Sequence, residues 1–117
     1  MNNGPGQFLK KVRVALTPRS ALLRTRLQNG AIVEGYNRAG YGGRGVYLFG
    51  DSLEPEFNYL QQFLRPGQVF VDVGANVGVF TVKAAKEVGN DGLVIAIEPF
   101  IETALRLSHN VRANGYS

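Results

Sequence analysis

Several residue types that build common functional sites are absent or scarce in this chain of 117 residues. It has no cysteine, which excludes a disulfide framework and any metal site that needs thiolate ligands. Its one histidine, His109, excludes a metal site built from several imidazoles. The sequence therefore predicts no metal centre.

Long hydrophobic runs are also missing. No apolar run reaches the roughly 18 residues that a bilayer-spanning helix needs. Near the N-terminus, Lys10, Lys11 and Arg13 interrupt the segment QFLKKVRVAL, so it lacks the apolar stretch of about 7–15 residues found in secretory signals. We therefore expect a cytoplasmic protein with no membrane partner.

Acidic residues are scarce in the first half of the chain. Residues 1–50 hold eight Lys or Arg residues and a single acid, Glu34, whereas residues 51–117 hold five basic and eight acidic residues. The formal net charge of +4 is thus +7 in front and −3 behind. Such a basic segment is typical of a nucleic-acid or membrane arm, or of a solvated leader. The solvated leader is the more common case, so we do not expect a nucleic-acid partner.

The first region, residues 1–50, is predicted to be a basic leader followed by a β-hairpin. Asn29-Gly30 separates two strand-like runs in RTRLQNGAIVEGY, which predicts a hairpin with a type I′ turn. The glycine-rich segment NRAGYGGRG (37–45) predicts a loop. VYLF (46–49) predicts a further strand.

The second region, residues 51–117, has the alternating rhythm of an α/β protein. VFVDV and LVIAI are apolar runs without alternation, which is typical of parallel strands covered on both faces. The predicted elements are a helix opened by Pro55, a strand at 69–73, a helix from about Gly78, a strand at 93–97 and a helix at 101–113. This order predicts a βαβ unit in a parallel sheet. On the last helix one face is expected to hold Ile101, Ala104, Leu105, Ser108 and Val111. His109 and Asn110 are expected to be surface or capping residues.

The stretch VFVDVGANVGVFTV places small and polar residues where a buried strand turns into a helix. It holds Asp72, Gly74, Asn76 and Gly78. Glu98 follows 20 residues after Gly78, at the end of the next strand. In open α/β sheets ligands bind at the carboxyl ends of strands, and a strand-end carboxylate can accept hydrogen bonds from both ribose hydroxyls. These residues predict a site for a nucleoside-containing cofactor.

The details of the turn favour one cofactor. The dinucleotide fingerprint G-x-G-x-x-G fails, because Asn76 and Val79 stand where glycines are needed. A phosphate-binding P-loop also fails, and no Lys or Arg occurs in residues 66–82. Asp72 beside the turn favours a cationic ligand. S-adenosylmethionine, which carries a ribose, a sulfonium and an ammonium but no phosphate, fits these constraints.

The second region of the chain, together with the few residues before it, resembles a known protein family. Residues 46–115, approximately, resemble the start of an FkbM-family methyltransferase domain. The segments that carry the resemblance are FGDSLEPEFNYLQQFLRPGQ and, directly after it, VFVDVGANVGVFTVKAAKEVGNDGLVIAIEPF. The resemblance implies an α/β fold: a partial class I methyltransferase (Rossmann-like) parallel sheet, here with an N-terminal β-hairpin extension. It also implies S-adenosylmethionine as methyl donor and O-methylation of a hydroxyl on a sugar, polyketide or related small molecule. The cofactor-binding residues it implies are Asp72, Gly74, Asn76 and Gly78 at the methionine end, Glu98 at the ribose and Phe100 near adenine.

Each assignment has a structural alternative. Asp72 could cap the following helix, Glu98 could be a solvated strand end, and Phe100 could pack in the core. The resemblance also implies that 51–117 is the N-terminal part of a truncated domain, because the acceptor pocket of class I enzymes comes mostly from later strands. No catalytic base is therefore identified, and we expect open sheet edges prone to self-association. The alternative functions are a non-catalytic or regulatory fragment and a nucleic-acid-binding module.

Overall fold

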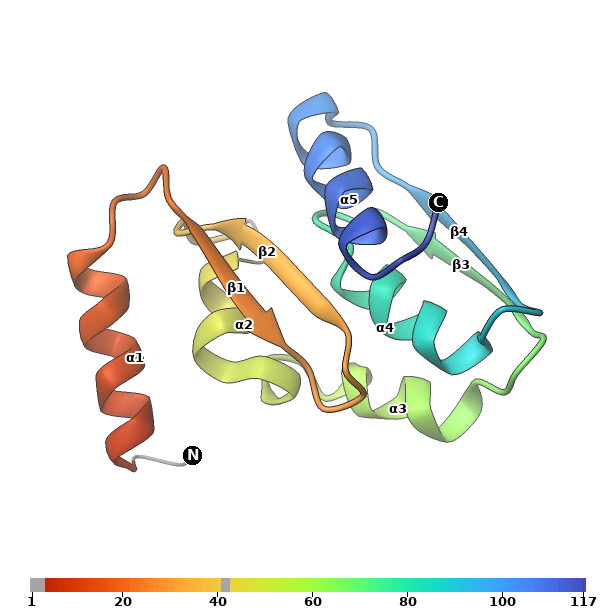
Figure 1. Ribbon diagram of the computed structural model, residues 1–117, viewed down its shortest axis with the longest axis horizontal. Coiled ribbons are helices and arrows are strands. Elements are labelled where there is room, and N and C mark those ends of the chain that lie inside the picture. Colours follow the sequence, from red (N-terminus) through yellow and green to blue (C-terminus); the bar gives the residue numbers. More distant parts are fainter. Residues whose placement is uncertain (1–3, 41–42) are drawn as a thin grey trace.

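A computed structural model describes residues 4–40 and 43–117 (Figure 1). The elements are α1 (Pro5–Leu16), β1 (Leu22–Arg26), β2 (Ile32–Tyr36), α2 (Gly43–Phe49), a short 3₁₀ turn η1 (Gly50–Ser52), α3 (Glu56–Phe63), β3 (Val69–Val73), α4 (Val79–Val88), β4 (Leu93–Ile97) and α5 (Ile101–Ala113). The strands form two separate two-stranded sheets. The predicted α/β class is confirmed.

The hairpin at the front of the chain is confirmed, but its turn differs from the predicted type. Strands β1 and β2 pair antiparallel, with Arg26 opposite Ile32. The Leu27 N–H donates to the Ala31 carbonyl at 2.8 Å, and the Gly30 N–H donates to the Leu27 carbonyl at 3.0 Å. Only Gly30 of the Asn29-Gly30 pair has a positive φ, +88°. The connection is therefore a three-residue loop with glycine in the left-handed position, and not a two-residue type I′ turn.

The predicted βαβ unit is present in the second half. Strand β3 pairs parallel with β4, with Val69 opposite Leu93 and Val73 opposite Ile97. Helix α4 connects them and begins directly after Gly78, as predicted. This is the Rossmann-like parallel pair that the sequence predicts, and the hairpin is its N-terminal extension.

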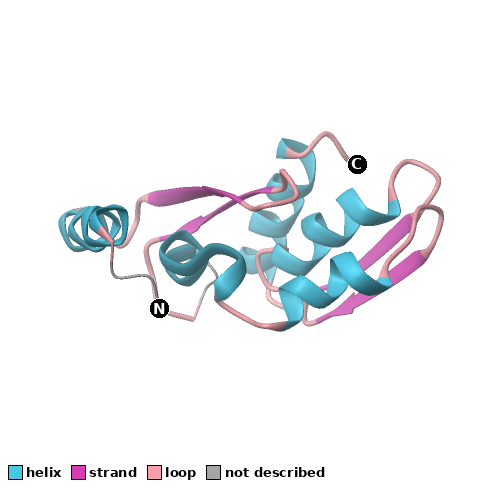
Figure 2. Ribbon diagram, turned by 90° about the horizontal axis from the view of Figure 1, so that it is seen from below, coloured by secondary structure: helices cyan, strands magenta, loops and turns pink. Residues whose placement is uncertain are grey.

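The expectation that both faces of these strands are covered is wrong for the part of the chain that the structure describes. Figure 2 shows the helices on one side of the β3–β4 pair, with the strands at the margin of the molecule. The outward face carries Val69, Val71, Val73, Leu93, Ile95 and Ile97, each between 43 % and 76 % exposed. We call these six residues the bare sheet face.

Two predictions about the first 50 residues are corrected. Residues 46–49 are not a strand but the second half of α2, in which Val46 is buried. Helix α2 lies so close to β2 that a Cβ on Gly43 would sit 2.3 Å from the Gly35 carbonyl carbon, so this approach requires glycine. Of the predicted loop 37–45, residues 43–45 belong to α2, and residues 41–42 lie outside the described residues.

The supposed leader contains a helix, α1, which the sequence reasoning missed. Its apolar residues follow a helical spacing, although Lys10, Lys11 and Arg13 stand among them. Within residues 4–40 and 43–117, no helix combines the length and the hydropathy needed to cross a bilayer.

The two halves share one hydrophobic core. Its cluster joins Ala31 and Val33 of the hairpin to Phe57 of α3 and Val82 of α4. The Phe57 and Phe80 rings meet edge to face, with their centroids 4.6 Å apart. Beside this core, the buried Lys83 ammonium of α4 pairs with the carboxylate of Asp51 in η1. Asp51 also accepts the Gln28 N–H at 2.9 Å, so the pair links α4 to the hairpin loop.

Helix α5 and its C-cap residue, Asn114, close the free edge of the hairpin through two asparagines. Asn114 exchanges hydrogen bonds with both backbone groups of Ile32, each at 2.7 Å. Asn110, expected to be a surface or capping residue, is fully buried and exchanges hydrogen bonds with both backbone groups of Glu34, each at 2.9 Å. The predicted apolar face of α5 is confirmed only in part, because Val111 packs against the core whereas Ile101 and Leu105 are exposed. We call Asn110 and Asn114 the asparagine clamp.

Candidate functional site

The turn between β3 and α4 has an unusual backbone that explains its small residues. Gly74, Asn76 and Gly78 all have positive φ, at +75°, +53° and +92°. Around Gly74 the space is open, whereas a Cβ on Gly78 would meet Leu107 Cδ1 at 2.4 Å. Glycine at 78 thus serves both the left-handed conformation and the close packing of α5 on the turn.

The end of β4 holds this turn in place. The Ile97 carbonyl accepts the N–H groups of Gly74 and Ala75, at 2.9 and 3.0 Å. Glu98 continues the contact: its Oε2 accepts the Asn76 N–H at 2.8 Å, and its Oε1 accepts the Phe100 N–H at 2.9 Å. Two residues separated by 22 positions are therefore joined at the carboxyl ends of neighbouring parallel strands. Glu98 is not simply a solvated strand end.

A cavity of about 640 Å³ opens at this point, within the usual range for small-molecule sites. Its lining residues are Gly40, Gly74, Asn76, Glu98, Pro99, Phe100, Ile101, Glu102 and Thr103. Four of the six residues predicted to bind a cofactor, Gly74, Asn76, Glu98 and Phe100, are therefore brought together. Phe100 is 74 % exposed, so it is not a core residue.

The other two predicted residues lie beneath the turn. Asp72 is buried, and its Oδ2 accepts a hydrogen bond from the Thr81 hydroxyl at 2.6 Å. No side-chain cap bond forms at the start of α4, so capping does not account for Asp72. Neither Asp72 nor Gly78 lines the cavity. Both support the shape of the turn: Asp72 through α4, and Gly78 through its contact with α5.

The charge of the cavity is one-sided. Glu98 and Glu102 line it, and no Lys or Arg does so among the described residues. One polar atom at the site also lacks a partner there: Asn76 Oδ1 is buried without a hydrogen bond in the described part of the chain. An anionic wall and an unused acceptor favour a ligand that carries positive charge and N–H or O–H donors.

Sequence reasoning missed three contributors to the site. Gly40, in the loop after β2, lines the cavity, and Arg38 Nη1 of the same loop lies 3.8 Å from Glu102 Oε1. Asn110 Nδ2 donates to the Val77 carbonyl at 2.8 Å, which ties α5 to the turn itself. The signal available for Asn110 was its i, i+4 spacing with Asn114; the proximity of residue 40 had no sequence signal.

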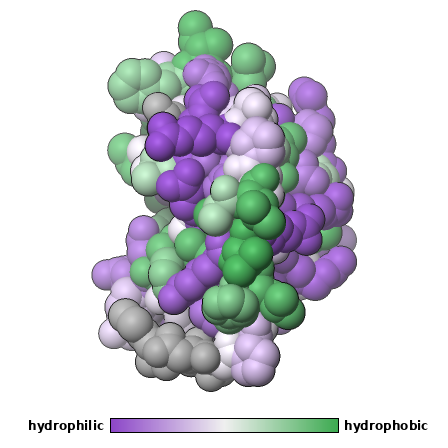
Figure 3. Space-filling view, turned by 90° about the vertical axis from the view of Figure 1, so that its left-hand side faces the viewer, coloured by the Kyte–Doolittle hydropathy of each residue, from purple (hydrophilic) through white to green (hydrophobic). Residues whose placement is uncertain are grey.

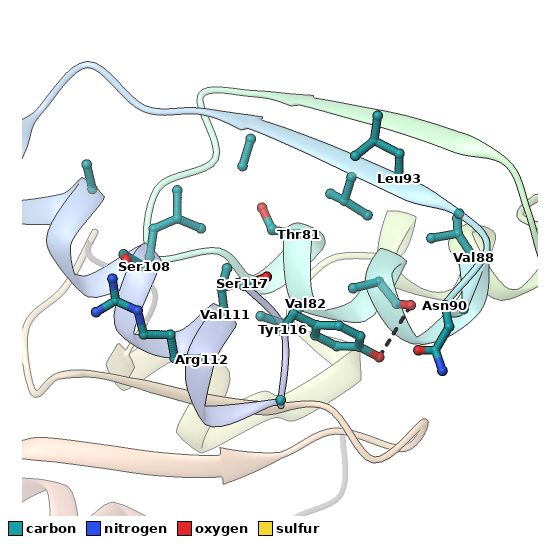
Figure 4. A pocket seen from close by; sticks show the side chains of 18 residues that line it. Thr81, Val82, Val88, Asn90, Leu93, Ser108, Val111, Arg112, Tyr116 and Ser117 are labelled. Carbon is teal, nitrogen blue, oxygen red and sulfur yellow. Dashed lines mark hydrogen bonds between the residues drawn. The ribbon is translucent and has the colours of Figure 1, made fainter.

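A second cavity, of about 650 Å³, lies between α4, β4 and α5 (Figure 4). Its walls are mainly small and apolar side chains, with Arg112 and Tyr116 at the α5 side. The Tyr116 hydroxyl lies 3.5 Å from the Ala85 carbonyl oxygen, and the Lys86 ammonium lies 5.6 Å from the Tyr116 ring centre. Among the described residues, no Asp or Glu side chain and none of the predicted site residues line this cavity. The glycine-turn cavity is therefore the better candidate.

Comparison with known proteins gives similarity to methyltransferases. No family model matches the chain. It is 36 % identical over 70 residues to the ribosomal RNA large subunit methyltransferase E of Azoarcus sp. (strain BH72), covering 60 % of this chain and 32 % of that protein. It is 35 % identical over 68 residues to the protein of the same name from Vesicomyosocius okutanii subsp. Calyptogena okutanii (strain HA), covering 58 % and 30 %.

Among solved structures, a protein-L-isoaspartate O-methyltransferase aligns with a TM-score of 0.47 and 15 % identity, covering 95 % of this chain and 38 % of that one. The chain spans about a third of the length of the curated relatives that it matches. The curated proteins that share sequence similarity with this chain are methyltransferases by name.

Proposed function

We propose that this chain is the cofactor-binding part of an S-adenosylmethionine-dependent methyltransferase. The observation that carries the proposal is the convergence of Gly74, Asn76, Glu98 and Phe100 on one cavity without a basic lining residue. A phosphate-bearing cofactor would need cations or a helix N-terminus free of acidic neighbours. A sulfonium and an ammonium suit an anionic wall. The two methyltransferase relatives support the same assignment.

The residues at the cavity fit the parts of this cofactor. The Glu98 carboxylate has about four lone-pair sites and uses two for backbone N–H groups, so acceptors remain for the two ribose hydroxyls. Asn76 Oδ1, unpartnered among the described residues, is an acceptor for an ammonium donor. The exposed Phe100 ring offers a face for adenine. When bound, the cofactor supplies the methyl group; the residues of this chain hold and orient it.

The first candidate acceptor is a hydroxyl on a sugar, polyketide or related small molecule. This proposal rests on the resemblance of the D-V-G-A-N-V-G turn and the following Glu98-Pro99 to the FkbM family. No catalytic base is assigned, because the described residues around the cavity do not include a group placed against an acceptor.

A second candidate acceptor is RNA. Both curated relatives are named for ribosomal RNA of the large subunit, and residues 1–50 of this chain carry a net charge of +7. Basic surfaces bind the phosphate backbone with an affinity that falls as salt rises. Binding of ribosomal RNA fragments that weakens steeply with salt would favour this acceptor, and its absence would favour the small molecule.

Calorimetric titration with S-adenosylhomocysteine tests the proposed function. We expect one molecule to bind per chain, while ATP and NAD⁺ do not bind, because no Lys or Arg among the described residues lines the cavity and the nearby Arg38 is paired with Glu102. Glu56, an exposed acid on α3, offers a matched control: Glu56→Ala should leave the titration unchanged. If neither S-adenosylhomocysteine nor S-adenosylmethionine binds, the chain is a non-catalytic module and the proposal fails.

A further inference from the structure

Helix α1 carries an apolar stripe that faces away from the rest of the molecule. Its members are Phe8, Leu9, Val12 and Leu16, exposed by 66 %, 65 %, 39 % and 80 %. Figure 3, which views the molecule from the side where α1 lies, shows a hydrophobic band flanked by hydrophilic side chains. Large apolar side chains gathered in one exposed patch mark a binding surface more often than single exposed residues do.

The side of α1 opposite the apolar stripe is held against the body of the protein, so the stripe faces outward. At about 100° per residue, Val14 lies on the other side of the helix from Val12, and it is half-buried against the body of the protein. The buried Asn37 side chain donates to the carbonyls of Val14 and Thr17, at 2.9 and 2.7 Å. Arg44 in turn holds Asn37 at 2.9 and 2.7 Å. The stripe therefore points outward because the C-terminal end of α1 is anchored, and not because the helix is loose.

Basic side chains flank the apolar stripe, and α1 contains no Asp or Glu. Lys11 and Arg13 stand on either side of it, and Lys10 lies next to Arg13. The Lys10 ammonium and the Arg13 guanidinium lie 5.6 and 5.8 Å from the centre of the Tyr47 ring. The first acidic residue of the chain is Glu34. The exposed surface of α1 is thus apolar in the middle and positive along its margins.

We propose that α1 binds the surface of an anionic lipid bilayer, an interaction that goes beyond the proposed methyl transfer and does not depend on it. A 12-residue helix is about 18 Å long, too short to span but suited to lie in the plane of the headgroups. Phe8 and Leu16 enter the acyl boundary, while Lys11 and Arg13 extend to the phosphates. This inference departs from the sequence-based expectation of no membrane partner, which concerned spanning and secretory segments.

Other occupants fit the stripe less well. Pairing of α1 with a second copy would bring Lys and Arg margins together with no acid on either helix. RNA would match the cations but leave the four apolar side chains in water. The bare sheet face is apolar as well, but its six members lie on β3 and β4, and these strands contain no Lys or Arg and one acid, Asp72, so the face lacks the charge complementarity for this partner.

Co-sedimentation of the 117-residue protein with vesicles tests the proposal. We expect binding to phosphatidylcholine vesicles that contain about one phosphatidylglycerol in three lipids, and roughly tenfold weaker binding to phosphatidylcholine alone. The double variant Phe8→Ser/Leu16→Ser should bind anionic vesicles at least about tenfold more weakly. The matched control Val71→Thr, on the bare sheet face, should bind as the unmodified protein does.

Tryptophan fluorescence gives a second readout, because the chain has no tryptophan. The emission of Phe8→Trp should shift to the blue with anionic vesicles, and that of Val71→Trp should not. Equal binding by Phe8→Ser/Leu16→Ser, a shift only in Val71→Trp, or no binding to anionic vesicles would each overturn the proposal. The proposal would also be overturned if the protein bound RNA but not vesicles, and if Lys11→Gln/Arg13→Gln abolished that RNA binding.

Discussion

The Glu98 carboxylate shows how one side chain can shape a site and also serve it. Its two oxygens accept the N–H groups of Asn76 and Phe100, which fixes the turn after β3 against the end of β4. The remaining lone pairs are free for a ligand in the cavity that Glu98 lines. Replacing it therefore affects both the loop and the proposed cofactor, and the two effects must be measured separately.

We predict that Glu98→Ala weakens binding of S-adenosylhomocysteine by about 1–3 kcal/mol, the range for losing hydrogen bonds to a charged acceptor. Glu98→Gln keeps an oxygen for one backbone N–H and should fold more stably than Glu98→Ala, while still binding the cofactor more weakly than the unmodified protein. Calorimetry gives the affinity and thermal unfolding gives the stability. Unchanged affinity in both variants would place the ribose elsewhere.

The two glycines of the turn should respond differently to a methyl group. Gly74→Ala meets open space, so only its positive φ opposes the change, at a cost of about 1–2 kcal/mol. Gly78→Ala has the same backbone strain and also places Cβ against Leu107, so its free energy of unfolding should fall further. Chemical denaturation measures both. Equal losses of unfolding free energy in the two variants would show that α5 moves aside freely. The double variant Gly78→Ala/Leu107→Ala removes the contact with Leu107 and checks whether Gly78→Ala then costs no more than Gly74→Ala.

At the scale of elements, the asparagine clamp makes a helix act as the neighbour of a strand. Asn110 and Asn114 offer amide groups to alternate residues of β2, in the positions where another strand would donate and accept. The edge of the hairpin is thereby closed without a third strand. Because Asn110 also donates to the Val77 carbonyl, the hairpin and the turn between β3 and α4 share one side chain.

We predict that Asn110→Ala lowers the free energy of unfolding by about 2–4 kcal/mol, because backbone groups of Glu34 and Val77 lose their partner in a buried place. Asn58→Ala, at an exposed position of α3, should change it by less than about 0.5 kcal/mol. Urea denaturation measures both. Amide hydrogen exchange should also speed up at Glu34; a loss of stability without that change would mean that the clamp does not hold β2.

At the scale of the whole molecule, the described residues cover one face of the parallel β3–β4 pair with helices and leave the bare sheet face exposed. The outward residues of β3 and β4 are all Val, Leu or Ile. Such a surface favours association, since apolar area removed from water stabilises by about 25 cal/mol per Å². The open strand edges add unpaired backbone groups to the same region.

We predict that the 117-residue protein self-associates in a concentration-dependent way. Val71→Thr/Ile95→Thr keeps β-branched side chains in the strands and should shift the equilibrium toward the monomer, as measured by sedimentation velocity. Leu16→Ser on α1, a more exposed apolar residue, serves as the control and should have a smaller effect. If Leu16→Ser has the larger effect, α1 and not the sheet mediates association.

The sequence predicted the second half of the fold better than the first, for physical reasons. The order of β3, α4, β4 and α5 follows from local periodicity and from the glycine turn, and four of six predicted site residues meet at one cavity. VYLF has strand propensity, but its place in α2 is decided by packing of Gly43 on β2, a non-local contact. The burial of Asn110 likewise depends on β2, far away in the chain, and the i, i+4 spacing of Asn110 and Asn114 does not by itself predict that contact.

The asparagine clamp has a consequence for the order in which the chain can fold during synthesis. Its bonds join residues 76 and 82 positions apart. On a ribosome that adds about 5–20 residues per second, the hairpin edge waits on the order of 4–16 s for Asn114 to be made. During that interval β2 exposes its backbone groups to other nascent chains. A slower codon tract after residue 36 would lengthen this exposure, and rapid translation through to α5 would shorten it, so the yield of folded protein should depend on the speed of elongation between the hairpin and the helix that closes it.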